Sequence, residues 1–341
     1  MNEPTSYHTF NEIHSQPAVW QAALERASDA PIASLEKYAQ TLFTGCGSTY
    51  YLSLAAAALY QSLTHRPARA IPGGELLLNP QTTLTDQSTL LVAISRSGAT
   101  TETVKAVERF KEAKQGDVVV ITNYDTGLTE LADIAIVIPE GQEESVAQTR
   151  SFASMFVAAT TFSVRMAGAT NGLLSAMQGL PEVGERLLQT YDGLAREIGE
   201  NLDFDRFYFL GSGMRYGLAS EVNLKMKEMT LTHSEPFHFL EFRHGPMSMV
   251  NEKAVVVGLV SEKNFRHEQA VLDEMQALGG SILSLGERQT DVAFHSHIPE
   301  SVRGVLYLPV LQLMAFYRSR VKGLNPDHPT NLTAVVQLDN L

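Results

Sequence analysis

The sequence predicts an α/β protein built from two parallel sheets, each flanked by helices in a three-layer sandwich. Short, almost continuously apolar segments alternate with longer helical ones, which is typical of parallel strands that are buried on both faces. The same order of strand, Gly-x-Gly turn and helix occurs twice along the 341 residues. A chain of this length accommodates two domains of ordinary size, each with its own core.

The first half is expected to begin with a helix at 11–30 and to continue as alternating strands and helices. The expected strands are 41–45, 89–95, 117–123 and 134–139. The expected helices between them are 48–63, 99–114 and 128–133. Sheets of this kind bind ligands at the carboxyl ends of their strands, so the turns that follow the strands are the first places to look for function.

The second half repeats this pattern after a helical stretch near 151–199. Residues 206–229 mirror 41–61, residues 254–286 mirror 90–123, and 305–323 are expected to form a closing strand and helix. We therefore expect four parts along the chain. They are an N-terminal helical segment at 1–30, a first domain at 31–174, a linker helix at 175–203, and a second domain with a C-terminal tail at 204–341.

Composition narrows the class of partner. The net charge of −12 disfavours nucleic acid and anionic membranes, although backbone dipoles still allow a small phosphorylated ligand at short range. The single cysteine, Cys46, cannot form an intrachain disulfide, and apolar runs such as 254–260 are too short to span a bilayer. The N-terminus does not resemble a signal peptide, so we expect a soluble cytoplasmic protein.

A cluster of hydroxyl residues follows the strand at 89–95. The cluster supplies four hydroxyls, one glycine and one arginine: Ser95, Arg96, Ser97, Gly98, Thr100 and Thr101. Several donors at a helix N-terminus suit a phosphate, but Ser and Thr are also common as plain helix caps, so both interpretations stay open on the residues alone. The similar TGCGST turn at 44–49 favours a ligand. Neither turn has the spacing of a nucleotide-binding loop.

The SRSGAT loop and the upstream GCGST turn resemble the sugar isomerase (SIS) domain. The two-copy layout resembles the isomerase half of glutamine–fructose-6-phosphate aminotransferase, as well as stand-alone phosphosugar isomerases and deaminases. The resemblance covers roughly residues 30–340. It implies two tandem SIS domains of flavodoxin-like architecture in an enzyme of amino-sugar metabolism that needs no metal or cofactor.

The resemblance also implies which residues hold a sugar phosphate. They are Ser48, Thr49, Ser95, Arg96, Ser97, Thr100 and Val146. Arg96 stands where the family usually has glutamine, so its contact with the ligand is expected to differ. The segment ESVAQTRSF at 144–152 resembles a family segment whose valine backbone touches the sugar, although Gln148 replaces a serine there.

Two further motifs resemble the catalytic part of the family. EVNLKMKEM at 221–229 matches E-x-x-x-K-x-K-E, and EFRHGP at 241–246 matches E-[LF]-[KR]-H-G-P. The sixteen-residue step from Glu228 to His244 agrees with the separation in the family. That agreement is more specific than either motif alone.

The residues of the first motif fall on one helical face. Glu221, Lys225 and Glu228 are spaced at i, i+4 and i+7, which is also the pattern of an ordinary solvated salt-bridged face. The resemblance implies that Glu228 moves a proton between neighbouring sugar carbons and that Lys225 keeps this carboxylate ionised. It implies that His244 opens the sugar ring and comes from the neighbouring subunit of a homodimer.

Two departures from the aminotransferase narrow the expected reaction. The sequence starts with MNEP rather than a nucleophilic cysteine, so we expect no glutaminase activity, and Ala334 stands where the resemblance implies an imine-forming lysine in the tail. We therefore expect glucosamine-6-phosphate and water to give fructose-6-phosphate and ammonia, which makes the protein a hydrolase of the SIS type. The alternatives are a galactosamine-6-phosphate deaminase, a plain aldose–ketose isomerase, and a non-catalytic sugar-phosphate sensor.

We expect no metal site, because neither group of nearby histidines has a recognised ligand spacing. The groups are His233, His238 and His244, and, on an expected strand, His295 and His297. Cys46 lies in the ligand turn without an evident base, so it is expected to be a buried packing residue rather than a nucleophile.

Overall fold

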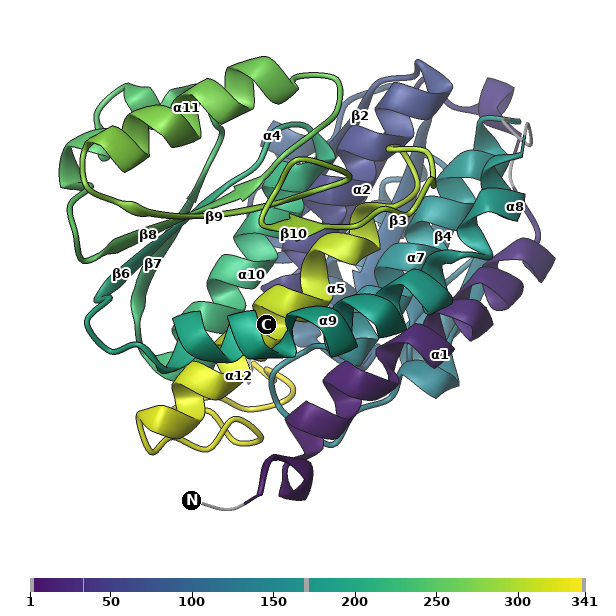
Figure 1. The fold of residues 1–341 in the computed structure, drawn as a ribbon. Helices are drawn as coiled ribbons and strands as arrows, with labels where there is room; N and C mark the ends of the chain where they lie inside the picture. The colour runs from purple at the N-terminus through teal and green to yellow at the C-terminus, as the bar shows by residue number, and fades with distance from the viewer. Residues whose placement is uncertain (1–2, 33, 169–171, 339–341) are drawn as a thin grey trace. The chain divides into compact units, whose positions relative to one another are not determined.

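The structure is a computed structural model that describes residues 3–32, 34–168 and 172–338. Contacts group the chain into two compact units, and each unit contains one five-stranded parallel sheet (Figure 1). The first-sheet unit comprises Ala18–Glu143, Arg150–Gln178 and Thr333–Leu341. The second-sheet unit comprises Met1–Pro17, Glu144–Thr149 and Gly179–Leu332. These units are interleaved along the chain, whereas the borders expected from the sequence follow one another serially.

The first sheet has the strand order β2-β1-β3-β4-β5, with every pair parallel. Its strands are β1 (Gln40–Gly45), β2 (Ala68–Pro72), β3 (Thr89–Ser95), β4 (Val118–Thr122) and β5 (Ile134–Val137). The helices of this half are α1 (His8–Asp29), α2 (Ser48–Thr64), α3 (Gly73–Leu78), α4 (Pro80–Thr83), α5 (Thr101–Glu112), α6 (Gly127–Glu130), α7 (Arg150–Met166) and α8 (Leu173–Met177). The chain passes from one unit to the other within α1.

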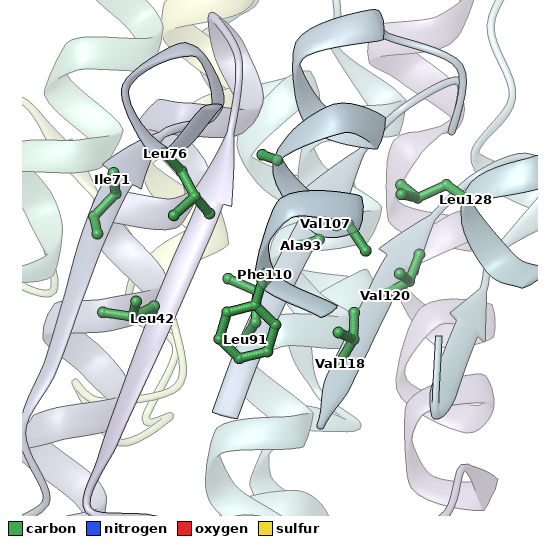
Figure 2. Close-up of a cluster of buried hydrophobic side chains, with 11 residues drawn as sticks. Leu42, Ile71, Leu76, Leu91, Ala93, Val107, Phe110, Val118, Val120 and Leu128 are labelled. Atoms are coloured by element: carbon green, nitrogen blue, oxygen red, sulfur yellow. The ribbon is translucent and has the colours of Figure 1, made fainter. Parts of the chain in front are cut away.

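Apolar side chains cover both faces of the first sheet. On one face, side chains of four strands pack against α3, α5 and α6, with Phe110 of α5 placed over Leu91 and Val118 (Figure 2). Strand residues alternate between faces, so Phe43 points to the other side, where its ring lies 5.6 Å from that of Tyr60 in α2. Tyr60 in turn stacks on Phe162 of α7 at 6.5 Å. Both faces of the first sheet are therefore buried under helices.

The second sheet has the strand order β10-β9-β8-β6-β7, again with every pair parallel. Its strands are β6 (Arg206–Leu210), β7 (His233–Phe237), β8 (Ala254–Leu259), β9 (Ser281–Gly286) and β10 (Val292–Ala293). Its helices are α9 (Leu180–Glu200), α10 (Met214–Thr230), α11 (Phe265–Ala277) and α12 (Leu308–Val321). The two parallel sheets with flanking helices confirm the predicted α/β class.

The two faces of the second sheet are covered by different segments. On one face, Tyr208 of β6 packs with Phe242, Leu272 and other residues of α11 and of the loop after β7. On the opposite face, Phe207 lies under the guanidinium of Arg318 from α12, at 5.0 Å. Helix α10 packs on α12 and on β6 and β7, so it belongs to this second face (Figure 1).

Most of the expected elements are present, and the misses have physical reasons. The strand expected at the start of 305–323 is wrong, because Gly304–Tyr307 forms a 3₁₀ turn whose Tyr307 hydroxyl donates to the Val260 carbonyl at 2.6 Å. His295 and His297 are not on a strand, and their φ angles are positive, at 45° and 57°. The expected elements omit β2 and β7, which are edge strands containing proline and few apolar residues.

Phe110 offers a test of the first core. Its side chain is fully buried, so Phe110→Ala is expected to lower the free energy of unfolding of this unit by about 3–5 kcal/mol through lost burial and the cavity that remains. Urea unfolding followed by the fluorescence of Trp20 measures this, since Trp20 is the single tryptophan, is 1% exposed and lies in the same unit. The matched control is Glu112→Ala, an exposed site on the same helix. Equal shifts for both variants would contradict the packing described here.

Candidate functional site

The two turns predicted to bind an anion follow neighbouring strands of the first sheet. Strand β1 pairs with β3, with Thr44 opposite Ala93, so the turn after β1 and the loop after β3 leave the sheet at the same carboxyl edge. Ser48 and Thr49 begin α2, and residues 96–100 lead into α5. The structure therefore brings together these two predicted groups at the edge where doubly wound sheets bind ligands.

Both helices at this edge begin without a side-chain cap. Thr100 is the N-cap residue of α5, yet its side chain makes no capping hydrogen bond. Gly47 occupies the corresponding position of α2, with φ at 56°, and has no side chain to offer. Uncapped helix N-termini present N–H groups and a positive dipole end, which suits an anion. This geometry disfavours plain capping as the reason for the hydroxyl at Thr100.

The loop after β3 is folded tightly by its own hydroxyls. Ser95 Oγ accepts the Gly98 amide at 3.1 Å, and Ser97 Oγ accepts the Ala99 amide at 3.1 Å. Gly98 has φ at 63°, and a Cβ there would lie 2.1 Å from Thr126 Oγ1. The position therefore excludes other residues on both backbone and steric grounds. The result is a compact loop whose backbone lies close to any ligand at the edge.

The turn after β1 is likewise held by hydrogen bonds from one of its own side chains. Thr49 Oγ1 lies 2.9 Å from the Cys46 amide and 3.0 Å from the Cys46 carbonyl, so it donates to the carbonyl and accepts from the amide. Ser48 and Thr49 are 5% and 3% exposed. Cys46 lies 3.4 Å from Thr103 Oγ1, and burial raises the pKa of its thiol, which is unfavourable for a nucleophile.

Arg96 contacts protein groups that the sequence did not indicate. Its guanidinium is 7% exposed, lies 3.9 Å from the fully buried carboxylate of Glu143, and donates to the Ala334 carbonyl at 2.8 Å. The tail continues along α5, where the Val336 carbonyl accepts the Thr101 amide at 3.3 Å. Leu338 N donates to Thr101 Oγ1 at 3.2 Å. The tail at 333–338 therefore lies against the start of α5, and a role of Arg96 in binding phosphate stays a prediction.

Val146 lies in the second-sheet unit, in the short segment Glu144–Thr149. Its amide donates to the Asp327 carbonyl at 2.9 Å, and the Asp327 carboxylate accepts the amides of His8 and Thr9 at 3.0 and 2.8 Å. The neighbouring Ser145 is held by the carboxylate of Glu12. The backbone at Val146 is thus fixed by contacts within its own unit.

The residues of the EVNLKMKEM motif form a buried charged triad on α10. The Lys225 side chain is 1% exposed, its Nζ lies 3.2 Å from Glu221 Oε1, and it forms a closer ion pair with Glu228. Burial disfavours the charged ammonium, but the two carboxylates outweigh burial and raise the pKa of Lys225. The solvated salt-bridged face, which this spacing also fits, is therefore not what forms here: Glu221 is fully buried and the Glu228 side chain is 13% exposed.

The second sheet separates Glu228 from His244 within one chain. Glu228 lies in the last turn of α10, which packs on the α12 face of the sheet. His244 follows Arg243, which pairs with Glu274 of α11 at 2.6 Å, so it belongs to the opposite face. His244 is exposed. Within one copy of this unit, the two groups therefore lie in the layers on opposite sides of the sheet.

Across residues 3–32, 34–168 and 172–338, no group of three or more His, Cys, Asp or Glu side chains is arranged to hold a metal ion. Within the same ranges, no helix has the length and apolar character needed to cross a membrane.

The buried triad leads to a prediction about stability. Replacing Lys225 with methionine leaves two carboxylates without their cation, so Lys225→Met is expected to lower the free energy of unfolding by about 3–5 kcal/mol. Adding Glu221→Leu is expected to recover much of this loss, because one uncompensated charge is removed. Denaturant unfolding followed by circular dichroism measures both. Lys227→Met, an exposed site on the same helix, is the matched control. A double variant no more stable than the single one would contradict the charge argument.

The Arg96 contacts lead to a second prediction. Replacing Arg96 with glutamine removes the hydrogen bond to the Ala334 carbonyl, so peptides covering 333–338 are expected to exchange their amide hydrogens faster. Hydrogen exchange measured by mass spectrometry gives the rates. Arg109→Gln, which alters an exposed arginine of α5, is the control. Unchanged exchange in Arg96→Gln would show that the tail is held without this side chain.

Comparisons with known proteins identify relatives along nearly the whole chain. A glutamine–fructose-6-phosphate aminotransferase (isomerizing) of Pyrococcus horikoshii is 32% identical over 99% of this chain and 59% of its own length. The aminotransferase of Methanothermobacter thermautotrophicus is 26% identical, with the same shares. The chain thus spans about three-fifths of the length of these relatives. A crystal structure of glucosamine-6-phosphate deaminase from Thermotoga maritima matches with a TM-score of 0.81 and 26% identity, over 97% of this chain and all of the other.

The fold also matches enzymes of more distant sequence. Tagatose-6-phosphate ketose/aldose isomerase from Escherichia coli has a TM-score of 0.83 at 22% identity, over 96% of this chain and 98% of the other, which supports the fold alone. The family model of the SIS domain matches at two places, residues 34–165 and 203–317. The first matched range contains the strands of the first sheet, and the second contains those of the second sheet. Together the two ranges make up more than half of the chain. The chain therefore belongs to the SIS domain family.

Proposed function

We propose that this protein is a phosphosugar isomerase of the SIS type that deaminates an amino-sugar phosphate. The expected reaction converts glucosamine-6-phosphate and water into fructose-6-phosphate and ammonia. The observation that carries the proposal is the buried triad on α10, in which Lys225 holds Glu228 beside Glu221 at the end of a helix. A buried cation with two carboxylates is costly to fold, and such arrangements are concentrated at functional sites.

The phosphate end of the substrate is assigned to the carboxyl edge of the first sheet. Hydroxyls and N–H groups meet there at two uncapped helix N-termini, which favours a phosphate dianion. The proposed contacts are Ser48, Thr49, Ser95, Ser97 and Thr100, with the Val146 backbone on the sugar. Binding energy from a phosphate lies away from the reacting carbons and can be used to position them.

The proton transfer is assigned to Glu228. Moving a proton from C2 to C1 turns the aldose into the ketose form, and one carboxylate placed over both carbons takes and returns it. For an amino sugar, the product of this step is an imine at C2, and attack by water releases ammonia and leaves the ketone. Lys225 is a positioning residue in this scheme, because its ammonium fixes the carboxylate of Glu228 through an ion pair.

The proposal includes a homodimer with a shared active site. Glu228 and His244 lie on opposite faces of one sheet, so a site that needs both must take them from two copies of the chain. His244 is exposed, as a residue that reaches a partner must be. Its imidazole suits proton transfer to and from the ring oxygen near neutral pH, which opens the pyranose before isomerisation.

Deamination is preferred to amino transfer because of the tail. Ala334 occupies the position of the family lysine, and its methyl group offers no amine for an imine with a ketose. The similarity to the deaminase of Thermotoga maritima, over that whole chain, supports the same preference. Galactosamine-6-phosphate and glucose-6-phosphate remain the substrates to compare with glucosamine-6-phosphate.

The reaction is tested by measuring ammonia and ketose together. Purified protein incubated with glucosamine-6-phosphate is expected to release both in equal amounts, and Glu228→Gln is expected to lower the rate by about 10²–10⁴-fold while keeping phosphate binding. Glu185→Gln, an exposed carboxylate of α9, is the matched control. Ketose from glucose-6-phosphate without ammonia from any amino sugar would make the protein a plain isomerase. Binding without turnover of any of the three sugars would make it a sensor.

The shared site predicts complementation between two inactive variants. Mixing Glu228→Gln with His244→Ala, after unfolding and refolding together, is expected to form mixed dimers with one intact site each. Random pairing then restores about a quarter of the wild-type rate. Each variant refolded alone is the control, and its rate stays low. If the mixture is no more active than its parts, the two residues do not act across an interface.

A further inference from the structure

The second sheet has a cavity at the edge that corresponds to the proposed phosphate site of the first. A hollow of about 300 Å³ lies at the carboxyl ends of β8 and β9, a size within the range of ~300–1,000 Å³ that is usual for small-molecule sites. Its lining includes Ser261, Glu262, Phe265, Glu287 and Arg288. All of it lies in the second-sheet unit. The residues implied for the sugar phosphate lie elsewhere, so the proposed reaction does not use this cavity.

A second hollow of about 270 Å³ adjoins the first and shares Glu262, Glu287 and Arg288 with it. Arg303 lines this second hollow and is 2% exposed. Its guanidinium contacts Glu262 Oε2 at 2.7 Å and Glu287 Oε2 at 3.6 Å, and donates to the Ile298 carbonyl at 2.8 Å. Its Nε–H is buried and has no acceptor within the described part of the chain. This nitrogen is therefore shielded from the cavity, and the groups there that a ligand can reach are those of Glu262 and Arg288.

The two carboxylates of this cavity differ in their burial and in their contacts. Glu287 is fully buried but accepts from Ser296 Oγ at 2.7 Å and from the His297 amide at 2.8 Å. Burial opposes its ionisation, yet these hydrogen bonds and the charge of Arg303 hold the pKa of Glu287 below its usual value. Glu262, in contrast, is 53% exposed at the cavity, so its carboxylate is accessible from solvent.

The loop after β8 is not arranged for a phosphate. The helices after the two corresponding loops, α5 and α11, both begin without a side-chain cap. In the second sheet, the Ser261 amide donates to the carboxylate of Glu268 at 2.6 Å, and the Lys263 amide donates to that of Glu300 at 3.4 Å. The protein's own carboxylates therefore occupy the amides that a phosphate would use. A dianion would also face Glu262 and Glu287 across the cavity.

The charged residues that line the cavity restrict the class of ligand that it can bind. Two carboxylates, Glu262 and Glu287, balance two guanidinium groups, Arg288 and Arg303, so a strongly charged ligand gains no net attraction. A purely apolar ligand would desolvate these charged groups without offering them a hydrogen bond. A molecule with many hydroxyls satisfies both the carboxylates and the guanidinium groups, because a hydroxyl can donate to a carboxylate and accept from a guanidinium. The ring of Phe265 offers an apolar surface for the C–H face of a sugar ring.

From this arrangement we propose that the cavity at the ends of β8 and β9 is a second, non-catalytic binding site for an unphosphorylated monosaccharide. Vicinal hydroxyls of the sugar bridge the exposed side chains of Glu262 and Arg288. The site goes beyond the proposed reaction and does not depend on it, since it would bind its sugar whether or not the first sheet turns over a sugar phosphate.

Ligand-observed saturation-transfer NMR tests this site directly on the full chain. Glucose and glucosamine are the probes, at concentrations around a Kd on the order of 1 mM, which is usual for a small ligand held by a few hydrogen bonds. At least one probe is expected to receive saturation, and Glu262→Gln is expected to weaken its binding about fivefold to tenfold through loss of a charged acceptor. Arg288→Ala is expected to act similarly without touching any buried pair, because Arg288 is exposed.

Two controls separate this site from the proposed phosphate site. Glu252→Gln makes the same chemical change at an exposed carboxylate just before β8, at the opposite edge of the sheet, and is expected to leave binding unchanged. Saturating inorganic phosphate is expected not to displace the sugar. The proposal is overturned if neither sugar binds, if both Glu262→Gln and Arg288→Ala bind as the wild type does, or if Ser97→Ala or phosphate abolishes the signal instead. That last result places the sugar at the first sheet.

Discussion

Parallel strand pairing is the constraint on which the rest of this structure depends. Every neighbouring pair in both sheets is parallel, so each strand must be followed by a crossover that returns the chain to the other edge. The crossovers cover both faces of each sheet and leave the strand ends as the sites for polar chemistry. The hydroxyl loop after β3 and the cavity after β8 lie at equivalent edges for this reason. The buried triad on α10 is the exception, because it lies in a crossover helix and its polar groups are paired with one another.

The two sheets show how one architecture can supply two kinds of loop. In both, a strand ends, the chain turns, and a helix begins. In the first sheet the loop amides of Gly98 and Ala99 are accepted by the hydroxyls of Ser95 and Ser97. In the second sheet the carboxylates of Glu268 and Glu300 accept the loop amides, so the loop is complete without a ligand. The difference between these loops is therefore the kind of acceptor, which is a neutral hydroxyl in the first sheet and a carboxylate in the second.

Much of the fold could be predicted because it depends on local pattern. The continuous apolar runs at 89–95 and 117–123 specify strands buried on both faces, and these strands are present as expected. The edge strands β2 and β7 could not be predicted in this way, since an edge strand needs fewer apolar residues and tolerates proline. The segment at 304–307 was misjudged because its apolar residues serve the core from a 3₁₀ turn, a choice that depends on tertiary contacts.

For the candidate site too, features that depend on local sequence could be predicted, and features that depend on distant contacts could not. Helical spacing places Glu221, Lys225 and Glu228 on one face, but their burial depends on tertiary packing around α10, which spacing does not encode. The contacts of Arg96 involve Ala334, 238 residues away, and no local pattern indicates them. The separation of Glu228 from His244 by a sheet requires the topology of the whole unit.

The hydrogen bonds of Asp327 limit the order in which the second-sheet unit can fold. Its carboxylate accepts amides of His8 and Thr9, which are 319 and 318 residues away along the chain, and its carbonyl accepts the amide of Val146. During synthesis on the ribosome, these hydrogen bonds cannot form until the chain has been translated past residue 327. The start of α1 and the segment around Val146 must therefore wait, without their final partner, while the intervening chain emerges. Contacts between residues far apart in the sequence slow folding, so these hydrogen bonds form late in the folding of the unit.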